Sequence, residues 1–573
     1  MHQYYRFCKD TKTHQDSIET TLTGKPIFSI PQINKGTAFT HEERHDLGLN
    51  GKLPTCVETL AQQTDRVYFQ LNQQKTRLQK YIFLNALHDK NQVLFYNLIR
   101  QHIEELMPII YTPTVGTAVK TFSQKFRRTR GIYLPYSQCK TLEAIEEYLD
   151  NRTNHDIDVI VVTDGEGVLG IGDQGVGAMD IPIAKLAVYT TLGHINPNRT
   201  LPIMLDVGTN NQACLADPMY LGWRHKRVEN DAYDDFISLF VQAVHNKFPH
   251  VFLHWEDLGR ENAARILKKY QSKICTFNDD MQGTGIVALA ALLSALKKSK
   301  QKLIDQNIVI FGGGTAGLGV AQRIALELQA EGLTEAQARA KLWIIDKSGL
   351  VLKNDMDITQ EQQPYARDPE LVNDWENTDL YHVIKHIKPG VLIGCSGVHG
   401  AFSQEAITTM AAQVDYPIIM PLSNPNSKIE AEPQDILNWT QGNALIATGS
   451  PFAPCQYQDE TIPISQCNNA LIFPAIGLGV TAVKPKHLTD TMLSVAAQAL
   501  AEKAVTTNQH ERQLLPTICD LPHFVKQIAL AIAEQAVKEK HCQPFSSEEI
   551  KKRIDEISWL PEYLPVLKKG KCT

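Results

Sequence analysis

The chain lacks several features that would set it apart from ordinary globular proteins. Its longest apolar run, near residues 286–296, is too short to cross a bilayer. The opening residues MHQYYRFCKDTKTH contain no apolar core of the kind found in secretory signals. The 11 cysteines are odd in number and have no CxxC spacing, which argues against a disulfide framework or a zinc cluster. A cytoplasmic protein that does not insert into membranes is therefore expected.

Strong positive charge is also missing. The formal net charge is −6 and no basic tract is present, so nucleic acid is not expected as the main partner. Hydrophobic residues make up 43% of the chain and charged residues 21%, which are ordinary values for a globular protein. A length of 573 residues is too great for one core and predicts two to four domains.

Apolar periodicity divides the chain. Residues 57–124 repeat apolar side chains at helical spacing, whereas residues 1–57 look mostly irregular. From residue 157, short apolar runs alternate with helical segments, which is typical of parallel α/β sheets. The predicted class is α/β, with a helical N-terminal domain (1–130), a parallel α/β substrate domain (131–278 with 468–538) and a Rossmann-type domain (279–467). Residues 539–573 are expected to form a surface tail.

Two acidic pairs organise the middle of the chain. Glu256 and Asp257 follow the apolar run 251–255, and Asp279 and Asp280 follow a helical crossover. Both pairs have apolar and aromatic neighbours, where an unpaired carboxylate is costly. Acids from the two ends of one crossover can meet at one point, and hard oxygen donors there suit Mg²⁺ or Mn²⁺. Helix capping and solvated charge are the alternative interpretation.

Lys185 and Tyr111 are candidates for proton transfer. Lys185 lies in MDIPIAKLAVYT, whose nearly uncharged surroundings can lower the proton affinity of an amine enough for it to act as a base. Alternatively, its stem follows the helix and its ammonium reaches water. Tyr111 stands on the proline-containing bend MPIIYTPTVG, which can hold it rigidly toward a cleft. A half-buried core tyrosine is the other interpretation.

A glycine-rich turn indicates a dinucleotide site. The predicted strand NIVIF runs into GGGTAGLG and then a helix, the context in which GxGxxG binds a pyrophosphate at a helix N-terminus. The predicted cofactor contacts in this turn are Gly312, Gly314, Thr315, Ala316 and Gly317. The next strand, KLWIID, ends on Asp346, which can accept both ribose hydroxyls and favours NAD over NADP, although Lys347 weakens that preference.

The same glycine pattern occurs a second time. Gly170, Gly172 and Gly175 also spell GxGxxG, but they follow a predicted hairpin, and Pro182 interrupts the segment that comes next. We therefore assign the cofactor to the later turn.

Six motifs in order resemble those of the malic enzyme family. They are YTPTVG at 111–116, the lysine at 185, WED at 255–257, CTFNDD at 275–280, the glycine turn at 312–317 and SNP at 423–425. The resemblance extends over roughly residues 34–538. It implies oxidation of L-malate with NAD(P)⁺ and loss of CO₂ to give pyruvate, by a homodimer or homotetramer.

The resemblance also implies roles for individual residues. Glu256, Asp257 and Asp280 would hold Mn²⁺ or Mg²⁺. Lys185 would be the general base and Tyr111 the general acid, and Asp279 would hydrogen-bond this pair. Asn424 and Asn468 would contact malate, with Asn424 also in the cofactor site.

One position departs from the family pattern. Many malic enzymes carry an arginine after TDGE that grips a malate carboxylate, whereas this chain has Gly167. Arg130 is a candidate replacement by its place in the chain alone. The Glu166–Gly167 pair also resembles malolactic enzymes, which release lactate and keep the nucleotide bound. A protein that binds NAD and a metabolite without chemistry is a third possibility.

Overall fold

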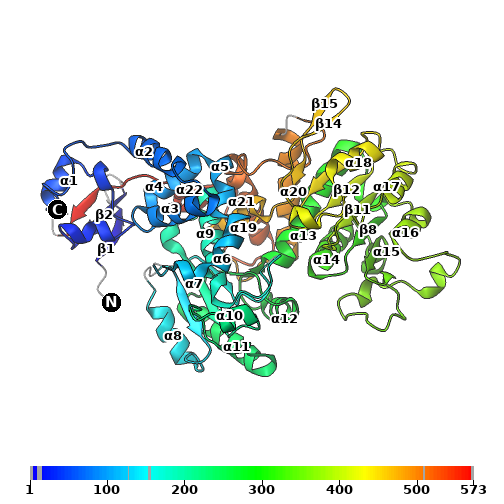
Figure 1. Ribbon diagram of the computed structural model, residues 1–573, viewed down its shortest axis with the longest axis horizontal. Coiled ribbons are helices and arrows are strands. Elements are labelled where there is room, and N and C mark those ends of the chain that lie inside the picture. Colours follow the sequence, from blue (N-terminus) through cyan, green and yellow to red (C-terminus); the bar gives the residue numbers. More distant parts are fainter. Residues whose placement is uncertain are drawn as a thin grey trace.

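A computed structural model describes residues 4–9, 16–126, 128–152, 156–168, 170–507 and 510–569 (Figure 1). The helical pattern of residues 57–124 corresponds to a run of short helices. Capping boxes formed by Thr59 with Gln62 and by Thr76 with Gln79 begin the first two of these helices. The helices are α2 (Leu60–Asn72), α3 (Arg77–His88), α4 (Gln92–Gln101), α5 (Ile103–Ile110), α6 (Thr114–Lys120) and α7 (Phe122–Lys125).

The two ends of the chain differ from the sequence prediction. Before α1 (His41–Asp46), strands β1 (Tyr5–Lys9) and β2 (Asp16–Thr20) pair antiparallel, and β17 (Val566–Lys568) adds parallel to β2. Helix α22 (Ser547–Ile557) packs against α21 (Leu521–Lys538). Residues 1–57, which were expected to be mostly irregular, thus contain two paired strands and a helix, and residues 539–573, which were expected to form a surface tail, contain α22 and β17. Residues 1–3, 10–15 and 570–573 lie outside the described residues. Figure 1 shows β1 and β2 near the red C-terminal strand at the left.

The next part of the chain contains a parallel sheet of five strands. Its order is β3 (Ile132–Pro135), β5 (Thr200–Asp206), β4 (Val159–Thr163), β6 (Phe252–Trp255) and β7 (Thr276–Asn278). Every residue of β4 and β6 is buried, as expected for a sheet covered on both faces. Val159 and Val161 face one core, which includes helix α9 (Asp180–Gly193), and Ile160 and Val162 face the other.

Helices on both faces position this sheet. Nearly all of α9 is buried, because it lies between the sheet and the helices α19 (Phe473–Val483) and α21. The opposite face is covered by α8 (Leu142–Asp150) and α11 (Asn230–Lys247), and α10 (Gln212–Ala216) lies in the loop after β5. The crossover helix α12 (Arg260–Tyr270) connects β6 to β7. After residue 468 the described chain packs against its first sheet again, where α19 contacts β6 and α9.

A second sheet has the predicted doubly wound organisation. Six strands are parallel, in the order β9 (Leu342–Asp346), β8 (Ile308–Phe311), β11 (Val391–Gly394), β12 (Ile418–Pro421), β13 (Leu445–Thr448) and β16 (Ser465–Gln466). Strand β10 (Gly349–Leu350) pairs antiparallel with the edge strand β9. The associated helices are α13 (Thr284–Ser299), α14 (Thr315–Ala330), α15 (Glu335–Ala340), α16 (Leu380–Ile387), α17 (Gln404–Ala411), α18 (Pro433–Trp439) and α20 (Asp490–Thr507). A small hairpin, β14 (Cys455–Tyr457) and β15 (Glu460–Ile462), projects from this domain (Figure 1).

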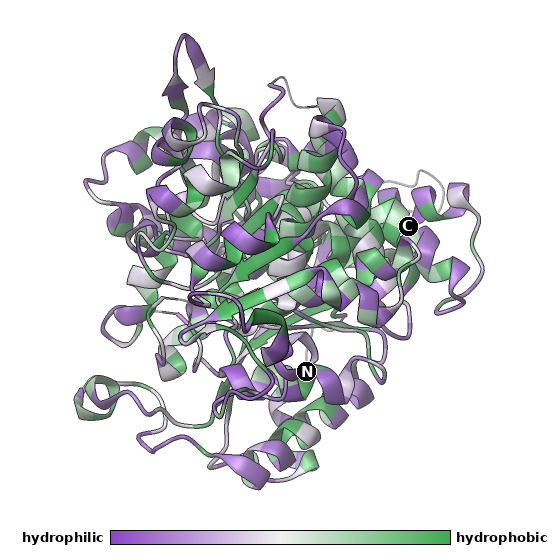
Figure 2. Cartoon of the chain, turned by 90° about the vertical axis from the view of Figure 1, so that its right-hand side faces the viewer, coloured by the Kyte–Doolittle hydropathy of each residue, from purple (hydrophilic) through white to green (hydrophobic). Residues whose placement is uncertain are grey.

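The hydropathy of the residues follows these layers. Figure 2 shows hydrophobic strands in the interior and mostly hydrophilic segments at the periphery. Within the described residues, no helix combines the length and the apolarity that crossing a membrane requires.

Candidate active site and nucleotide site

The acidic pairs meet because they follow neighbouring strands. Strand β6 leads into Glu256 and Asp257, and the adjacent parallel strand β7 leads into Asp279 and Asp280. One carboxylate oxygen from each of Glu256, Asp257 and Asp280 lies within 4.8 Å of the others. The three predicted ligands are thus close enough to share one ion.

The local backbone at these acids is unusual. Asp257 has φ +52°, a left-handed conformation in which aspartate is more common than most residues. Its backbone N–H donates to Asp280 Oδ2 at 2.9 Å. Asp280 lies on a single π-helical turn, Asp279–Gly283, a feature that is frequent at functional sites. These constraints bring the two loops together.

The closeness of these carboxylates raises the pKa values of two of them. Burial, together with the charge of Asp279, raises the pKa of Glu256 to about 8. Burial, together with the charges of Glu256 and Asp279, raises the pKa of Asp280 to about 7. A divalent cation would remove this repulsion, and three carboxylate oxygens are the hard donors that Mg²⁺ and Mn²⁺ prefer. The residues therefore fit such an ion.

Lys185 stands at the centre of the site. It is 2% exposed on α9, and its Nζ lies 3.1 Å from Glu256 Oε1 and closer still to Asp279 Oδ2. Burial lowers the pKa of this amine, but Asp279 and Glu256 outweigh it and raise the pKa well above the ordinary value. The apolar surroundings that the sequence suggested are therefore only part of the environment of Lys185, because acids distant in sequence also contact it. Its burial excludes the alternative in which the ammonium reaches water.

Tyr111 lies beside this amine, on the bend between α5 and α6. Lys185 Nζ is 5.4 Å from the centroid of the Tyr111 ring and 4.7 Å from that of Phe473. Burial raises the pKa of the Tyr111 hydroxyl well above its ordinary value, and the charge of Lys185 opposes that rise. The phenol therefore keeps its proton near neutral pH.

Three further residues, which the sequence did not single out, hold the acids. Asn469 Nδ2 donates to Asp279 Oδ2 at 2.9 Å. His254 Nε2 lies 2.8 Å from Glu256 Oε2, and its Nδ1 lies 2.8 Å from the Tyr189 hydroxyl. His254 could have been found, because it precedes Glu256 by two residues and therefore shares its side of the strand end. Tyr189 and Asn469 carry no comparable signal in the sequence.

A second group of possible ligands is less suitable. His254, Glu256 and Asp279 also offer ligand atoms within 4.8 Å of one another. However, the ammonium of Lys185 contacts both acids, and Glu256 also faces the imidazole. The other group, Glu256 with Asp257 and Asp280, is the better candidate because it offers three carboxylates, the hard donors that Mg²⁺ and Mn²⁺ prefer.

The two predicted asparagines occupy loop positions. Asn424 follows β12, and its Oδ1 accepts a hydrogen bond from the Ser450 hydroxyl. Asn468 follows β16, and its Oδ1 accepts from the Ala470 N–H at 2.9 Å. Asn469, the next residue, is the one that contacts an acid of the site.

The glycine turn has the geometry expected of a nucleotide site. It connects β8 to α14, which begins at Thr315 and Ala316. Gly312 has φ +117°, a conformation that favours glycine. A Cβ on Gly317 would lie 2.0 Å from Gly312 O, so the helix can approach the strand only without a side chain there.

Asp346 lies next to this turn, at the end of β9. Its Oδ2 accepts a hydrogen bond from Gln362 Nε2 at 2.7 Å, and the same amide donates to Gly313 O at 3.0 Å. Gln362 is 5% exposed and thus joins the glycine turn to the acid. In the earlier glycine pattern, Gly172 instead forms an antiparallel bridge with Val168, and Gly175 begins a 3-10 helix.

Gly167 leaves no room for the arginine found in many malic enzymes. A Cβ at this position would lie 2.4 Å from Leu258 O, and the Gly167 N–H donates to Asp257 O at 2.9 Å. Arg130 is engaged elsewhere among the described contacts: Nε donates to Asp89 Oδ1 and Nη1 to Asn85 Oδ1, each at 2.8 Å.

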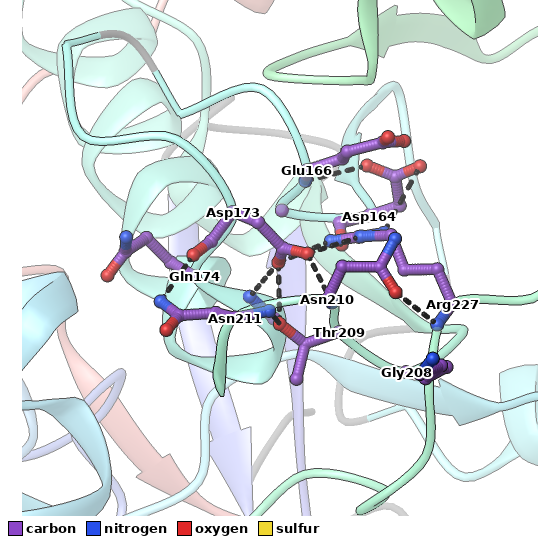
Figure 3. Close-up of polar contacts among 12 residues, drawn as sticks. Asp164, Glu166, Asp173, Gln174, Gly208, Thr209, Asn210, Asn211 and Arg227 are labelled. Carbon is purple, nitrogen blue, oxygen red and sulfur yellow. Dashed lines mark hydrogen bonds and ion pairs between the residues drawn. The ribbon is translucent and has the colours of Figure 1, made fainter. Parts of the chain in front are cut away.

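A buried polar network supports the loop that ends at Gly167 (Figure 3). Arg227 donates through Nε to Asp173 Oδ2 at 2.8 Å and through Nη2 to Asp164 O at 2.9 Å. Thr209 and Asn210 also donate to the Asp173 carboxylate. Arg227 thus connects the Asp173 carboxylate to the backbone at Asp164, close to Gly167 in the sequence.

Comparisons with known proteins agree with this architecture. Residues 88–271 match the family model described as malic enzyme, N-terminal domain, and residues 281–537 match malic enzyme, NAD binding domain. The NAD-dependent malic enzyme of Acinetobacter baylyi is 44% identical over 97% of this chain and 98% of its own length. That of Shewanella denitrificans is 45% identical over 95% and 97%.

The chain belongs to the malic enzyme family. Among solved structures, the malic enzyme of Entamoeba histolytica has a TM-score of 0.55 and 21% identity, covering 90% of this chain and 92% of that one. The malic enzyme of Pyrococcus horikoshii has a TM-score of 0.54 and 21% identity, covering 79% and 89%. These two share the fold of this malic enzyme family member.

Proposed function

We propose that this chain oxidises L-malate with NAD and decarboxylates the product to pyruvate and CO₂. The observation that carries the proposal is Lys185, buried between Glu256 and Asp279 beside a cluster of three carboxylates. The near full-length similarity to NAD-dependent malic enzymes supports the same reaction.

Glu256, Asp257 and Asp280 would hold Mg²⁺ or Mn²⁺. When bound, such a cation would act as a Lewis acid on the malate hydroxyl and offset the negative charge that keeps the proton on Lys185. The turn from Gly312 to Gly317 would hold NAD, which accepts a hydride when bound.

Lys185 and Tyr111 divide the proton transfers. Lys185 removes the proton of the malate C2 hydroxyl as hydride leaves the same carbon. Tyr111, which stays protonated near neutral pH, donates a proton to C3 after CO₂ has left. Asp279 holds the lysine in place, and Asn469 holds Asp279. Asn424 and Asn468 are proposed to contact malate from the loops after β12 and β16.

Product analysis tests the reaction. The purified protein is supplied with L-malate, NAD⁺ and Mn²⁺, and free NADH is followed by absorbance while pyruvate and lactate are quantified. Pyruvate and NADH in equal amounts are the expected result. Lactate without free NADH would identify a malolactic enzyme, and no turnover with intact nucleotide binding would identify a binding protein.

Two finer properties are part of the proposal. Asp346, held by Gln362, is expected to accept the ribose hydroxyls and disfavour a 2′-phosphate, so NAD should be preferred to NADP. A ratio of kcat/KM values for the two cofactors near one would contradict this. The family resemblance predicts a homodimer or homotetramer, which sedimentation analysis can distinguish.

A further inference from the structure

Glu430 is a buried acid that the proposed reaction does not use. It lies between the loop after β12 and the start of α18, and it is 0% exposed. Four donors converge on its carboxylate: the Ser396 N–H at 2.8 Å, the Ser396 hydroxyl at 2.9 Å, the Ser423 N–H at 3.3 Å and the Ser423 hydroxyl. The two serines follow β11 and β12, which are parallel neighbours. One carboxylate thus joins the loops at the ends of two adjacent strands.

The two serine hydroxyls extend this connection into the loop after β11. Ser423 Oγ accepts a hydrogen bond from the Gly397 N–H at 2.8 Å, and Ser396 Oγ accepts one from the Val398 N–H at 3.1 Å. Each hydroxyl therefore donates to the acid and accepts from the loop backbone. Glu430 fixes the shape of this loop as well as its distance from its neighbour.

A carboxylate suits this position better than a neutral side chain of the same size. An ionised carboxylate only accepts hydrogen bonds, through about four positions, and so can serve all the donors that surround it. An amide would turn its own NH₂ group toward one of the serine donors. The end of β11 also fits the acid closely, because a Cβ on Gly394 would lie 2.6 Å from Glu430 Cδ.

The two loops lie on one side of the glycine turn. In the sheet order β9, β8, β11, β12, Asp346 ends β9 and the glycine turn follows β8. With the adenosine ribose at Asp346 and the pyrophosphate at the start of α14, the nicotinamide half of NAD extends over the ends of β11 and β12. The backbone after β11 borders the turn directly, since a Cβ on Gly312 would lie 2.7 Å from Ser396 N.

The loop after β12 also reaches toward the first sheet. Asn424, which is proposed to contact malate, directly follows Ser423. The next residue, Pro425, places its Cδ 3.7 Å from a Cβ built on Gly170, in the segment that connects β4 to α9. Holding Ser423 in place therefore holds the asparagine where the two sheets approach each other.

We propose that Glu430 is a positioning residue that holds the loops after β11 and β12 where nicotinamide and malate bind. This inference rests on the proposed function, which assigns NAD to the glycine turn and malate to Asn424. Being fully buried, Glu430 acts through Ser396 and Ser423 and touches neither ligand itself. Its replacement should weaken binding at the nicotinamide end of the cofactor and spare the adenosine end.

Ligands of different length test this division at equilibrium, without turnover. Dissociation constants are measured on the full chain for wild type, Glu430→Gln and the matched control Asp435→Asn, for NADH by fluorescence and for ADP-ribose by displacement of NADH. Asp435 is an exposed acid in the first turn of α18. We expect Glu430→Gln to weaken NADH binding by about tenfold and to leave ADP-ribose within about twofold of wild type. Asp435→Asn should match wild type for both ligands.

Ser423→Ala is a milder variant that keeps the buried acid. It removes one hydroxyl, which donates to Glu430 and accepts from the Gly397 N–H. We expect the same selective loss of NADH affinity, by about threefold, together with a raised KM for malate. In the Glu430→Gln background the same substitution should have a smaller effect, because the two residues act as a unit.

Three results would overturn the proposal. Equal losses of NADH and ADP-ribose affinity would mean that Glu430 supports the domain as a whole. Unchanged NADH affinity in Ser423→Ala would show that the loops do not depend on this connection, and full additivity of the two substitutions would show that they act separately. Thermal unfolding identifies any variant that has lost its structure; if Glu430→Gln does not fold, the NADH and ADP-ribose affinities of Ser423→Ala decide.

The outcome is separable from that of the proposed function. Wild type that makes no pyruvate, while Glu430→Gln loses affinity for NADH alone, would refute the reaction and leave this inference standing for the cofactor. Wild type that makes pyruvate, while both variants bind NADH and malate normally, would do the opposite.

Discussion

At the scale of single residues, the site is an ion-pair cluster built around one buried amine. Lys185 contacts Glu256 and Asp279, and Asn469 and His254 hold those two acids from the other side. Without a bound cation these contacts favour the ammonium form. The base function therefore depends on the charge that the acids carry, as well as on the burial of the lysine.

Replacement of the amine should abolish oxidation and spare the cofactor site. In Lys185→Ala we expect malate oxidation to fall by about 10²–10⁴-fold, the usual contribution of a general base. The NADH dissociation constant should remain within twofold of wild type, since Lys185 is not part of the glycine turn. Steady-state kinetics and fluorescence titration measure the two quantities, and near wild-type turnover would remove Lys185 from the mechanism.

Replacement of one of the three acids should weaken binding of the metal ion. For Asp280→Asn we expect Mn²⁺ affinity to fall by at least about tenfold, because one of three charged oxygen donors is lost. Asp231→Asn, on the exposed first turn of α11, is the matched control. Isothermal titration with Mn²⁺ measures both variants. A binding curve for Asp280→Asn that superimposes on that of the control would exclude Asp280 as a ligand.

At the scale of elements, sequence patterns predicted which segments form the site, but they did not predict the acidic surroundings of Lys185. The strand before Glu256 was visible as an apolar run, and the crossover to Asp279 as an amphipathic segment, whereas the short strand β7 before Asp279 was not predicted. Because β6 and β7 are parallel neighbours, their ends lie together. The surroundings of Lys185 were not visible, since its partners are 71 and 94 residues away in the chain. Local composition suggested an uncharged environment, whereas tertiary contacts made it strongly acidic.

The glycine turn is an element whose geometry allows a direct test. A Cβ at position 317 would meet Gly312 O at 2.0 Å, so Gly317→Ala must separate α14 from β8. We expect a loss of about 1–3 kcal/mol in stability and weaker NADH binding. Gly116→Ala is the control, since no atom lies within 4 Å of its added methyl group. Equal NADH affinities in the two variants would contradict the assignment of the turn.

At the scale of the whole molecule, one buried carboxyl should make stability depend on pH. Burial raises the pKa of Asp180, at the start of α9, to about 6, although Arg130 and Tyr81 oppose the rise. The folded state thus favours the protonated form. Its stabilising contribution is complete below the unfolded pKa near 4 and is lost as the pH rises through about 6.

Asp180→Asn should remove this dependence. At pH 8 we expect the variant to be more stable than wild type by up to about 3 kcal/mol, with little difference at pH 4. Thermal unfolding at the two pH values, with Asp231→Asn as the control, measures the effect. A difference between Asp180→Asn and wild type that does not change with pH would show that Asp180 has the same pKa in the folded and unfolded protein.

The chain termini were the least predictable part of the whole molecule. Strand β17 pairs with β2, and the Val566 N–H donates to Glu43 Oε1 at 2.9 Å, so the contacts that order this segment come from more than 500 residues earlier. Short strands whose partners are distant in the sequence give little periodic signal. A segment rich in lysine and proline is therefore predicted to be a surface tail. In the middle of the chain, by contrast, the apolar periodicity of most segments was enough to predict a helix or a strand.

The pairing of β17 with β2 also has a consequence for biosynthesis. Strands β1 and β2 are synthesised more than 500 residues before Val566–Lys568, so the edge of β2 lacks this neighbour while the chain between them is made. A nascent or prematurely terminated polypeptide therefore presents an open strand to other chains, a recognised route to aggregation.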